Sequence, residues 1–327
     1  MSPRIDTVDI VRVAGVAANR KLCREHYRLT LTAGGFRSCA PGQFVHISPA
    51  VGTASEYRVW DESNRHGALH SFDGIGVPLL RRAFSIAGLR QTAEAVEIDV
   101  IYRVVGTATR WMASLEPGDS VSCMGPLGNA FAISGSKPVA WLVAGGVGLP
   151  PMLWLAEALH RAGKRAVAFC GARSADLLPL TLDPDIPPAS DAQRAVASAS
   201  EFAAVGASVV ISTDDGTAGF HGHIGAALSA YARANPATAG DVVVYACGPE
   251  RMMQSVADYA IAHSVECYVC MERNMGCGTG MCQSCVVPLH DQTAPDAWRY
   301  ALCCTEGPVF DARRIIWEAA PAFAGSP

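Results

Sequence analysis

Val139-Ala-Trp-Leu-Val-Ala-Gly-Gly-Val-Gly148 is the stretch that decides the fold class of this 327-residue chain. Its apolar run over residues 138–144 predicts a buried strand, and the glycines that follow predict a tight turn into a helix over about residues 151–162. The apolar character continues to Ala156, but the glycines and prolines favour strand, turn and helix over a membrane span. We therefore expect no transmembrane segment.

The same alternation continues after this stretch. Strands are expected over residues 165–170, 207–212 and 241–246, and helices over residues 224–234 and 250–263. Residues 178–200, rich in Pro, Ala, Ser and Asp, are expected to form a loop. This β-α-β order predicts a parallel, doubly wound sheet, which we assign to a domain of residues 134–263.

Residues 1–133 have a different pattern, in which short alternating strands are separated by turn residues. Gln43-Phe-Val-His-Ile-Ser48 and Val96-Glu-Ile-Asp-Val-Ile-Tyr-Arg103 are two such strands. Their spacing predicts an antiparallel β-barrel domain. The polar, glycine-containing residues 50–76 are expected to form a long surface loop.

The composition limits the class of protein. Half of the residues are hydrophobic, 17% are charged and the formal net charge is −4, so the chain should fold and has no footprint for nucleic acid. Met1-Ser-Pro-Arg-Ile-Asp6 lacks the apolar segment of a signal peptide. Seven of the twelve cysteines fall between Cys267 and Cys304, which favours clustered metal ligands in a reducing cytoplasm.

The C-terminal cysteines have the spacing of an iron–sulfur site. Gly276-Cys-Gly-Thr-Gly-Met-Cys-Gln-Ser-Cys285 contains the C-x4-C-x2-C pattern of plant-type [2Fe–2S] centres, and a fourth cysteine follows at Cys303 or Cys304. Its glycines allow tight turns that bring thiolates and N–H groups around one cluster. Zinc is an alternative, but a zinc ribbon would have a second C-x2-C pair where this chain has adjacent cysteines. Residues 264–327 are assigned to a [2Fe–2S] domain.

Two turns of small residues predict a dinucleotide site. The glycines Gly145, Gly146 and Gly148 would present backbone N–H groups and a helix N-terminus to a pyrophosphate, although an ordinary strand–helix turn looks the same. Cys247-Gly248-Pro249 follows a later strand, at the edge where open α/β sheets bind ligands. Asp214 ends a strand between them and either binds ribose hydroxyls, which favours NAD over NADP, or only shapes a turn.

Arg82-Ala83-Phe84-Ser85 is a candidate flavin segment in the predicted barrel. A guanidinium binds phosphate with two hydrogen bonds, and Phe84 lies two residues further along the same strand face, where it can pack on a flat ring. Ser85 can hydrogen-bond a ring nitrogen. The same residues also fit an ordinary half-buried strand.

Taken in order, these segments resemble the ferredoxin–NADP reductase superfamily, in which a barrel binds FAD and the next domain binds the nicotinamide nucleotide. Arg82-Ala-Phe-Ser85 is similar to its flavin motif, and residues 145–148 and 247–249 are similar to its two nucleotide motifs. Residues 275–287, followed by Cys304-Thr-Glu-Gly-Pro-Val-Phe310, resemble the electron-transfer subunits of class 1B dihydroorotate dehydrogenases. So does Gly125-Pro-Leu-Gly128 with Phe131, and the resemblance covers nearly the whole chain.

The resemblance implies roles for individual residues. Arg82 would hold the FAD pyrophosphate, Phe84 would pack on the flavin and Ser85 would lie near its N5 atom. A second FAD-binding stretch would contain Tyr102, Gly106, Thr107 and Thr109. The cluster ligands would be Cys277, Cys282, Cys285 and Cys304. Ala83 and Ala108 depart from the proline and glycine that are common in the family.

The resemblance also implies an electron relay of pyrimidine biosynthesis. A flavin exchanges both hydrides and single electrons, so FAD belongs between the cluster and NAD. No acid–base pocket for an organic substrate is apparent, so we assign no catalytic residue. Dihydroorotate oxidation is expected on a separate FMN-type catalytic subunit, in a cytoplasmic heterotetramer with two copies of each subunit.

Two alternatives stay open. A diaphorase subunit of a hydrogenase, or a ferredoxin–NADP transhydrogenase, would carry the same flavin and nucleotide motifs. A non-catalytic zinc-binding or redox-sensing protein that retains a nucleotide fold is the alternative of another class.

Overall fold

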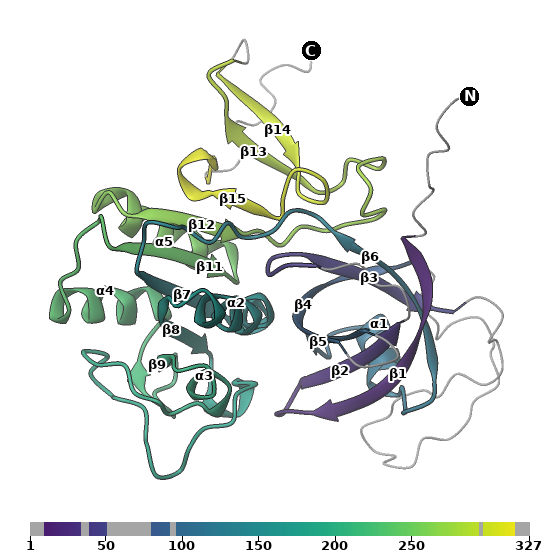
Figure 1. The fold of residues 1–327 in the computed structure, drawn as a ribbon, viewed down its shortest axis with the longest axis horizontal. Coiled ribbons are helices and arrows are strands. Elements are labelled where there is room, and N and C mark those ends of the chain that lie inside the picture. The colour runs from purple at the N-terminus through teal and green to yellow at the C-terminus, as the bar shows by residue number, and fades with distance from the viewer. Residues whose placement is uncertain (1–9, 34–38, 51–79, 92–95, 294–296, 318–327) are drawn as a thin grey trace.

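The computed structural model describes residues 10–33, 39–50, 80–91, 96–293 and 297–317. Apart from Ala50, the surface loop that we expected over residues 50–76 lies outside the described residues. Figure 1 shows a barrel beside a layered sheet with helices, and further strands lying above the place where the two meet.

The barrel is closed by six antiparallel strands within the described residues, in the order β1-β2-β5-β4-β3-β6. Alternate residues of each strand point inward, and Leu29, Val45 and Ile98 are fully buried there. The predicted antiparallel barrel is therefore confirmed. Its elements are β1 (Val11–Lys21), β2 (His26–Ala33), β3 (Phe44–Pro49), β4 (Arg82–Gln91), β5 (Val96–Arg103), α1 (Thr107–Ala113) and β6 (Ser120–Leu127).

The sheet has the order β10-β9-β8-β7-β11-β12-β15 in the part of the chain that the structure describes. Its neighbouring strands are parallel except for β12 and β15, which are antiparallel. The chain order reverses between β7 and β11, so the doubly wound prediction is confirmed and the switch point lies there. Its strands are β7 (Val139–Gly145), β8 (Arg165–Ala172), β9 (Ser208–Thr213), β10 (Phe220–His221), β11 (Val242–Cys247), β12 (Glu266–Cys270) and β15 (Val309–Asp311).

Helices cover both faces of this sheet. Successive residues of β7 point to opposite faces, so Leu142 packs with α2 (Leu149–Arg161) and α3 (Ser200–Ala203), whereas Val143 packs with α4 (Ile224–Ala234) and α5 (Glu250–Ala262). Helix α2 lies between sheet and barrel, and its Trp154 is buried in the barrel core. None of the helices in the described residues has the length and apolar character that a bilayer crossing requires.

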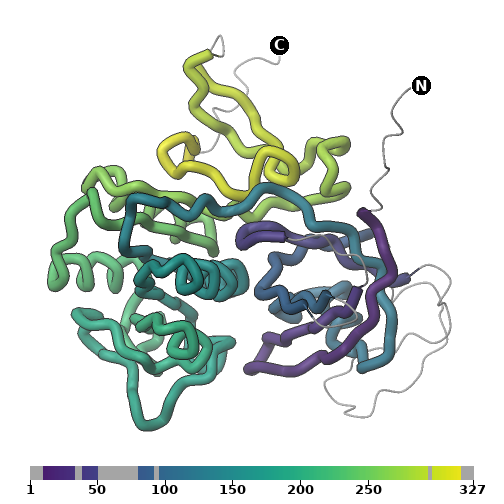
Figure 2. The backbone as a smooth tube through the Cα atoms, viewed as in Figure 1, coloured from purple at the N-terminus to yellow at the C-terminus, as the bar shows by residue number. Residues whose placement is uncertain are grey.

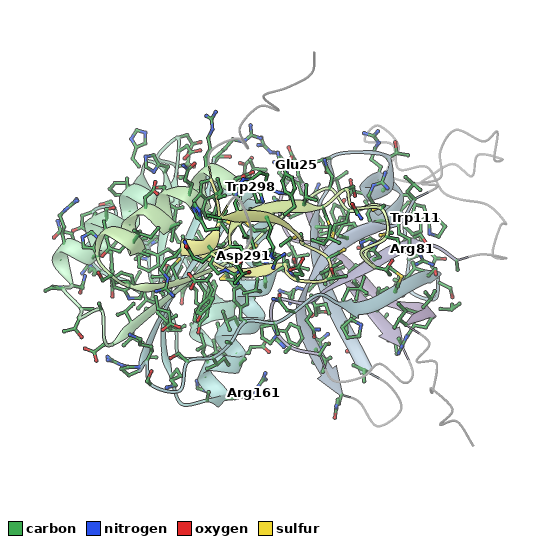
Figure 3. All side chains as sticks on the ribbon, turned by 90° about the horizontal axis from the view of Figure 1, so that it is seen from above. Glu25, Arg81, Trp111, Arg161, Asp291 and Trp298 are labelled. Carbon is green, nitrogen blue, oxygen red and sulfur yellow. The ribbon has the colours of Figure 1, made fainter. Side chains whose placement is uncertain are left out.

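The C-terminal part is built into both neighbours. Strands β13 (Val286–His290) and β14 (Trp298–Leu302) form a separate hairpin sheet, whereas β12 and β15 extend the large sheet. The sheet therefore continues past the boundary that we proposed at residue 264. Seen from above, Asp291 and Trp298 lie over the middle of the molecule, between the helices and the barrel (Figure 3).

One apolar core joins all three parts. It contains Phe44 and Leu127 from the barrel, Val143 from the sheet, and Cys285 and Ala301 from the C-terminal part. Figure 2 shows the chain passing from β6 to β7 beneath the C-terminal strands. The packing fixes the three parts relative to one another.

Candidate functional site

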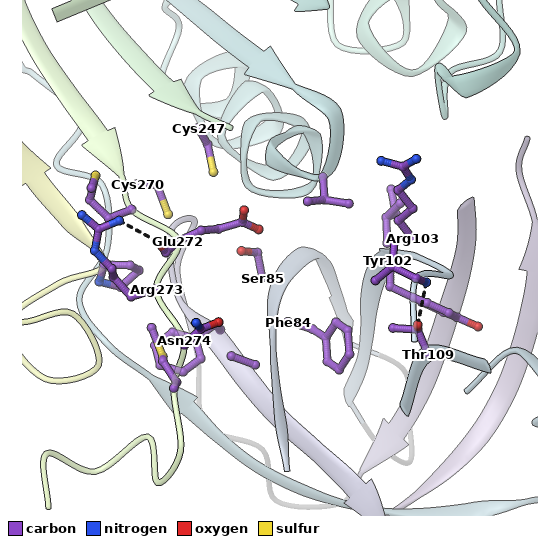
Figure 4. Close-up of a pocket in the computed structure, with 18 residues that line it drawn as sticks. Phe84, Ser85, Tyr102, Arg103, Thr109, Cys247, Cys270, Glu272, Arg273 and Asn274 are labelled. Atoms are coloured by element: carbon purple, nitrogen blue, oxygen red, sulfur yellow. Dashed lines mark hydrogen bonds between the residues drawn. The ribbon is translucent and has the colours of Figure 1, made fainter. Parts of the chain in front are cut away.

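A cavity of about 690 Å³ lies where the barrel, the sheet and the segment after β12 meet (Figure 4). Strand β4 contributes Ala83, Phe84 and Ser85 to its lining, and β5 and α1 contribute Tyr102 and Thr109. The sheet contributes Cys247, at the end of β11. The structure therefore brings six of the predicted binding residues from two parts of the chain to one cavity.

The barrel side of this cavity has a rigid aromatic wall. The ring of Phe84 meets that of Tyr102 edge-on, with centroids 6.1 Å apart. The Tyr102 hydroxyl donates a hydrogen bond to Asn19 Oδ1 at 3.1 Å, and burial raises the pKa of Tyr102 above its ordinary value. Since this wall is neutral and held in place, it can support a flat ring without rearrangement.

The turn before α1 is held by Thr109. Its hydroxyl accepts hydrogen bonds from the N–H groups of Val105 at 2.9 Å and Gly106 at 3.0 Å, and it lies 3.1 Å from the Gly106 carbonyl, to which it donates. Thr107 begins the helix. Gly106 and Thr107 support the wall of the cavity without being among its lining residues.

Arg82 begins β4 and is exposed. Its Nη1 donates to the carbonyl oxygens of Leu80 at 3.1 Å and Arg81 at 3.2 Å. These carbonyl contacts leave the guanidinium facing solvent beside the cavity rather than lining it.

A second cavity, of about 360 Å³, lies at the carboxyl edge of the sheet. Gly145, Gly146, Asp214 and Pro249 line it, as expected for a site at the switch point. The two predicted turns touch here, because a Cβ atom added to Gly148 would lie 2.0 Å from the carbonyl oxygen of Cys247. Gly148 and Gly248 therefore form the contact behind the cavity rather than its surface.

Glu272 is a site residue that the sequence analysis missed. It lines both cavities, together with Arg103 and Val147, so the two cavities meet at these residues. Its side chain is accessible to solvent from the two cavities. The surrounding protein nevertheless desolvates its carboxyl group, and this desolvation raises the pKa of Glu272. Its place directly after a parallel strand was the only signal available, and that strand had not been predicted.

The next residue anchors this segment to the sheet domain. Arg273 donates to both carboxylate oxygens of Glu250, at 2.8 and 3.0 Å. Glu250 is the first residue of α5. This bidentate pair fixes the segment that leads from the cavity lining to the cysteine loop.

The cysteine loop directs N–H groups at sulfur. The backbone N–H groups of Thr279 and Cys282 each donate to Cys277 Sγ at 3.4 Å. The hydrogen bonds from Cys282 and Thr279 lower the pKa of Cys277 to about 6. The Ser284 hydroxyl lies 3.2 Å from Cys282 Sγ and lowers the pKa of that thiol as well. The loop therefore favours thiolates, which are the form that binds iron.

The adjacent cysteines Cys303 and Cys304 point to different surroundings. Cys303 is fully buried, and its thiol donates to the Met271 carbonyl at 3.4 Å. The N–H of Cys304 donates to Cys285 Sγ at 3.4 Å. Burial and the neighbouring Cys285 thiol raise the pKa of Cys304 to about 11. Cys304 thus faces the cysteine loop and Cys303 faces the core.

The four predicted ligands form two close pairs, Cys277 with Cys282 and Cys285 with Cys304. No group of three or more His, Cys, Asp or Glu side chains in the described ranges has the arrangement of a metal site. The donor chemistry still fits an iron–sulfur cluster, because four thiol sulfurs are gathered in this region and N–H groups are directed at Cys277 and Cys285.

Comparison with known proteins agrees with an iron–sulfur site at the cysteine loop. The family model for the iron-sulfur cluster binding domain of dihydroorotate dehydrogenase B matches residues 272–316. The chain is 32% identical to the dihydroorotate dehydrogenase B (NAD(+)) electron transfer subunit of Bacillus caldolyticus, over 92% of this chain and 96% of that protein. It is 30% identical to the subunit of the same name from Streptococcus mutans, over 93% of this chain and 97% of that protein.

Solved structures share the fold. A structure of NADH-dependent reduced ferredoxin-NADP oxidoreductase superposes with a TM-score of 0.69 at 23% identity, over 94% of this chain and 91% of that chain. The ferredoxin reductase of carbazole 1,9a-dioxygenase gives a TM-score of 0.56 at 19% identity, over 78% of this chain and 66% of that chain. With the fold, the cysteine domain and nearly full-length sequence similarity in agreement, this chain belongs to the family of electron transfer subunits of dihydroorotate dehydrogenase B.

Proposed function

We propose that this chain passes electrons from a dihydroorotate-oxidising catalytic subunit, through a [2Fe–2S] cluster and FAD, to NAD+. The observation that carries this proposal is the 690 Å³ cavity, which is lined by the barrel, the sheet and the segment leading to the cysteine loop, and which adjoins the nucleotide cavity. When bound, FAD exchanges hydrides with NAD+ and single electrons with the cluster.

The flavin is assigned to the larger cavity. Phe84 and Tyr102 form its aromatic wall, and Ser85 offers a hydroxyl group to a polar ring edge. Thr109 lines the same cavity and holds the turn before α1 in place. Arg82, exposed at the start of β4, is assigned to the pyrophosphate. Ala83, Gly106 and Thr107 shape the same surface.

The nicotinamide nucleotide is assigned to the smaller cavity. Gly145, Gly146 and Gly148 present the turn before α2 to its pyrophosphate, and the turn of Cys247, Gly248 and Pro249 faces them. The Asp214 carboxylate lines this cavity and is assigned to the ribose hydroxyls, an arrangement that disfavours a 2′-phosphate.

The cluster ligands in this proposal are Cys277, Cys282, Cys285 and Cys304. The N–H groups directed at Cys277 and Cys285 support these two assignments, and the Ser284 hydroxyl beside Cys282 Sγ supports the third. The orientation of Cys303 toward Met271 supports the choice of Cys304 as the fourth ligand.

The proposal includes the assembly and its compartment. The family names imply a catalytic dihydroorotate dehydrogenase partner, and we propose two copies of each subunit. All twelve cysteines lie in described residues and are free thiols, which fits a reducing cytoplasm. We also propose the division of the chain at residues 133 and 263 into flavin, nucleotide and cluster domains.

The test is anaerobic co-expression with a dihydroorotate-oxidising subunit, using Cys282→Ser and Cys304→Ser as ligand variants. Both should abolish NAD+ reduction by dihydroorotate, because single electrons can no longer reach the flavin. Both should largely retain NADH oxidation by an artificial two-electron acceptor, because that activity needs only the flavin and nucleotide sites.

Cys303→Ser is the matched control, since a serine hydroxyl can still donate to Met271 and both activities should persist. Equal loss of both activities in the ligand variants contradicts the proposed order of carriers. Loss of dihydroorotate-dependent activity in Cys282→Ser and Cys303→Ser, but not in Cys304→Ser, contradicts only the choice of fourth ligand. A purified wild-type chain that contains zinc, and neither iron nor flavin, rejects the relay altogether.

A further inference from the structure

His46 is a buried histidine that the relay described so far does not use. It lies in β3, its side chain is 0% exposed, and neither ring nitrogen has a hydrogen-bond partner among the described residues. Burial, followed by the nearby charges of Arg81 and Arg82, lowers the pKa of His46 to about 4. The ring is therefore neutral near pH 7 and carries one N–H group, which lacks an acceptor. Buried polar atoms without partners are uncommon and unfavourable, so this one calls for an explanation.

Strand alternation shows which way the ring points. Val45 and Ile47 face the barrel interior, whereas Phe44 packs in the core shared with the C-terminal part. His46 therefore points out of the barrel, like Phe44, whose ring centroid lies 5.7 Å away.

The ring faces the cysteine loop at Gly278, the residue after the proposed ligand Cys277. A Cβ atom added to Gly278 would lie 3.0 Å from His46 Cε1 and 3.1 Å from His46 Nε2. Gly278 also has a φ of 74°, in the region that favours glycine. Because Gly278 has no side chain and can adopt this φ, the loop backbone can lie directly against the imidazole ring.

His46 also lies next to the flavin strand. Its cross-strand partner in β4 is Ala83, which lines the 690 Å³ cavity, as does Phe44. His46 itself is not among the lining residues of that cavity. The imidazole thus stands between the proposed flavin strand and the cysteine loop, and its Nε2 edge lies against the loop at Gly278 without a hydrogen-bond partner among the described residues.

We propose that His46 donates an N–H hydrogen bond to a sulfur of the cluster held by this loop and thereby raises its reduction potential. A donor directed at sulfur stabilises the added negative charge of the reduced state. The proposal rests on the proposed function, because it needs the cluster to be present. In this proposal His46 sets part of the difference in reduction potential between the flavin and the cluster, which lie on either side of it.

The test measures the cluster itself, in the full-length chain purified anaerobically. His46→Leu removes the donor and should shift the midpoint potential of the cluster to a lower value in an EPR-monitored titration. His46→Gln keeps an N–H donor and should give a smaller shift. With 15N-labelled histidine, pulsed EPR of the reduced wild-type cluster should detect a nitrogen coupling that His46→Leu and His46→Gln both lose.

His26→Leu is the matched control. His26 is also a buried histidine, with Nε2 unpartnered in the described residues, but it lines the nucleotide cavity. Its replacement should leave both the midpoint potential and the nitrogen coupling unchanged.

The outcomes separate this inference from the proposed function. A wild-type chain without iron and acid-labile sulfide removes the proposed function, and the inference with it. A wild-type chain that contains the cluster but shows no histidine nitrogen coupling overturns the inference alone. So does a His46→Leu variant with normal iron and flavin content and an unchanged potential. If His46→Leu does not fold, the labelled wild-type chain and His46→Gln still decide.

Discussion

Asp99 is a buried charged residue in the barrel that carries the proposed flavin strand. It is 4% exposed, and it accepts hydrogen bonds from Thr30 Oγ1 at 2.7 Å and from Arg90 Nη1 and Nη2 at 2.7 and 3.0 Å. These three residues belong to the neighbouring strands β2, β5 and β4. Burial raises the pKa of Asp99, but the hydrogen bonds from Arg90 and Thr30 outweigh it and lower the pKa overall.

Asp99→Asn should therefore lower the free energy of unfolding by about 1–3 kcal/mol at pH 7. Because the folded pKa lies below the unfolded value of about 3.9, the contribution of Asp99 is complete above that value. It is lost as the pH falls through the folded pKa. Urea unfolding at pH 7 and at pH 3 should show that the difference between wild type and variant shrinks in acid.

Asp258→Asn, at an exposed position of α5, is the control and should change the stability little at either pH. A deficit in Asp99→Asn that is equally large at both pH values would show that packing, and not the charge, accounts for the effect.

The fourth cluster ligand shows a limit of prediction at the scale of residues. The spacing alone left Cys303 and Cys304 open, and only the resemblance favoured Cys304. The difference between them lies in hydrogen bonds to Met271 and Cys285, which are far from both in the sequence. His46 and Glu272 were missed for the same reason, because their partners come from other elements.

At the scale of elements, the turn between β7 and α2 has the strictest requirement. Its Gly148 packs on the backbone of the turn after β11, where a Cβ atom would lie 2.0 Å from the Cys247 carbonyl oxygen and 2.6 Å from the Gly248 nitrogen. These are backbone atoms on a neighbouring buried strand end, so they cannot move aside as a flexible side chain can.

Gly148→Ala should lower the free energy of unfolding by about 1–3 kcal/mol, because the added methyl group must displace one turn from the other. The same displacement should weaken NADH binding, since both turns belong to the proposed nucleotide site. Thermal unfolding and NADH titration of the purified chain measure the two effects.

Gly135→Ala serves as the comparison. Gly135 precedes β7 and has no neighbouring atom within 4 Å of an added Cβ, so both properties should stay at the wild-type level. Unchanged melting and NADH affinity in Gly148→Ala would show that the contact between the turns is not required.

Elements with strong local patterns were predicted well. The strand over residues 96–103 and the helix over residues 224–234 agree with β5 and α4 to the residue. Helix α2 begins two residues earlier than expected, because the prolines lie in its first turn. Strands β12 and β15 were not predicted, since β15 has only three residues and pairs with a strand about forty positions earlier in the chain. Such a pairing leaves no local periodicity to read.

At the scale of the whole molecule, Asn129 joins the segment after the barrel to the C-terminal part. Its Nδ2 donates to the carbonyl oxygens of Glu306 and Val309, both at 2.9 Å. Its Oδ1 accepts from the Val309 N–H at 2.9 Å, and its backbone N–H donates to the Gly307 carbonyl at 2.6 Å. One side chain thus satisfies three backbone groups of the distant segment.

Asn129→Ala should lower the melting temperature and slow electron transfer between flavin and cluster, because it leaves partly buried backbone groups without partners and loosens the attachment of the cysteine loop. We expect the free energy of unfolding to fall by about 1–3 kcal/mol. Calorimetry and stopped-flow reduction by NADH, followed at flavin and cluster wavelengths, measure the two effects.

Ser136→Ala, a change at an exposed position of the same connecting segment, should have neither effect. Normal flavin-to-cluster transfer in a destabilised Asn129→Ala variant would indicate that the attachment supports folding only.

The arrangement of the site lay beyond sequence reasoning in one respect. The motifs predicted where the flavin strand, the glycine turn and the cysteine loop occur along the chain. They did not predict that the two cavities meet at Arg103, Val147 and Glu272, because that junction depends on how α2 packs between sheet and barrel.

The apolar core that runs through all three parts of the chain has a kinetic consequence. Redox proteins whose modules swing on tethers must diffuse between donor and acceptor, so solvent friction enters their turnover. Here Phe44, Leu127 and Val143 pack in the same core as Cys285 and Ala301. The strand proposed to face the flavin and the cysteine loop therefore do not move apart during turnover. Hops within this chain are then governed by fixed separations, and added viscogen slows only the meeting with outside molecules.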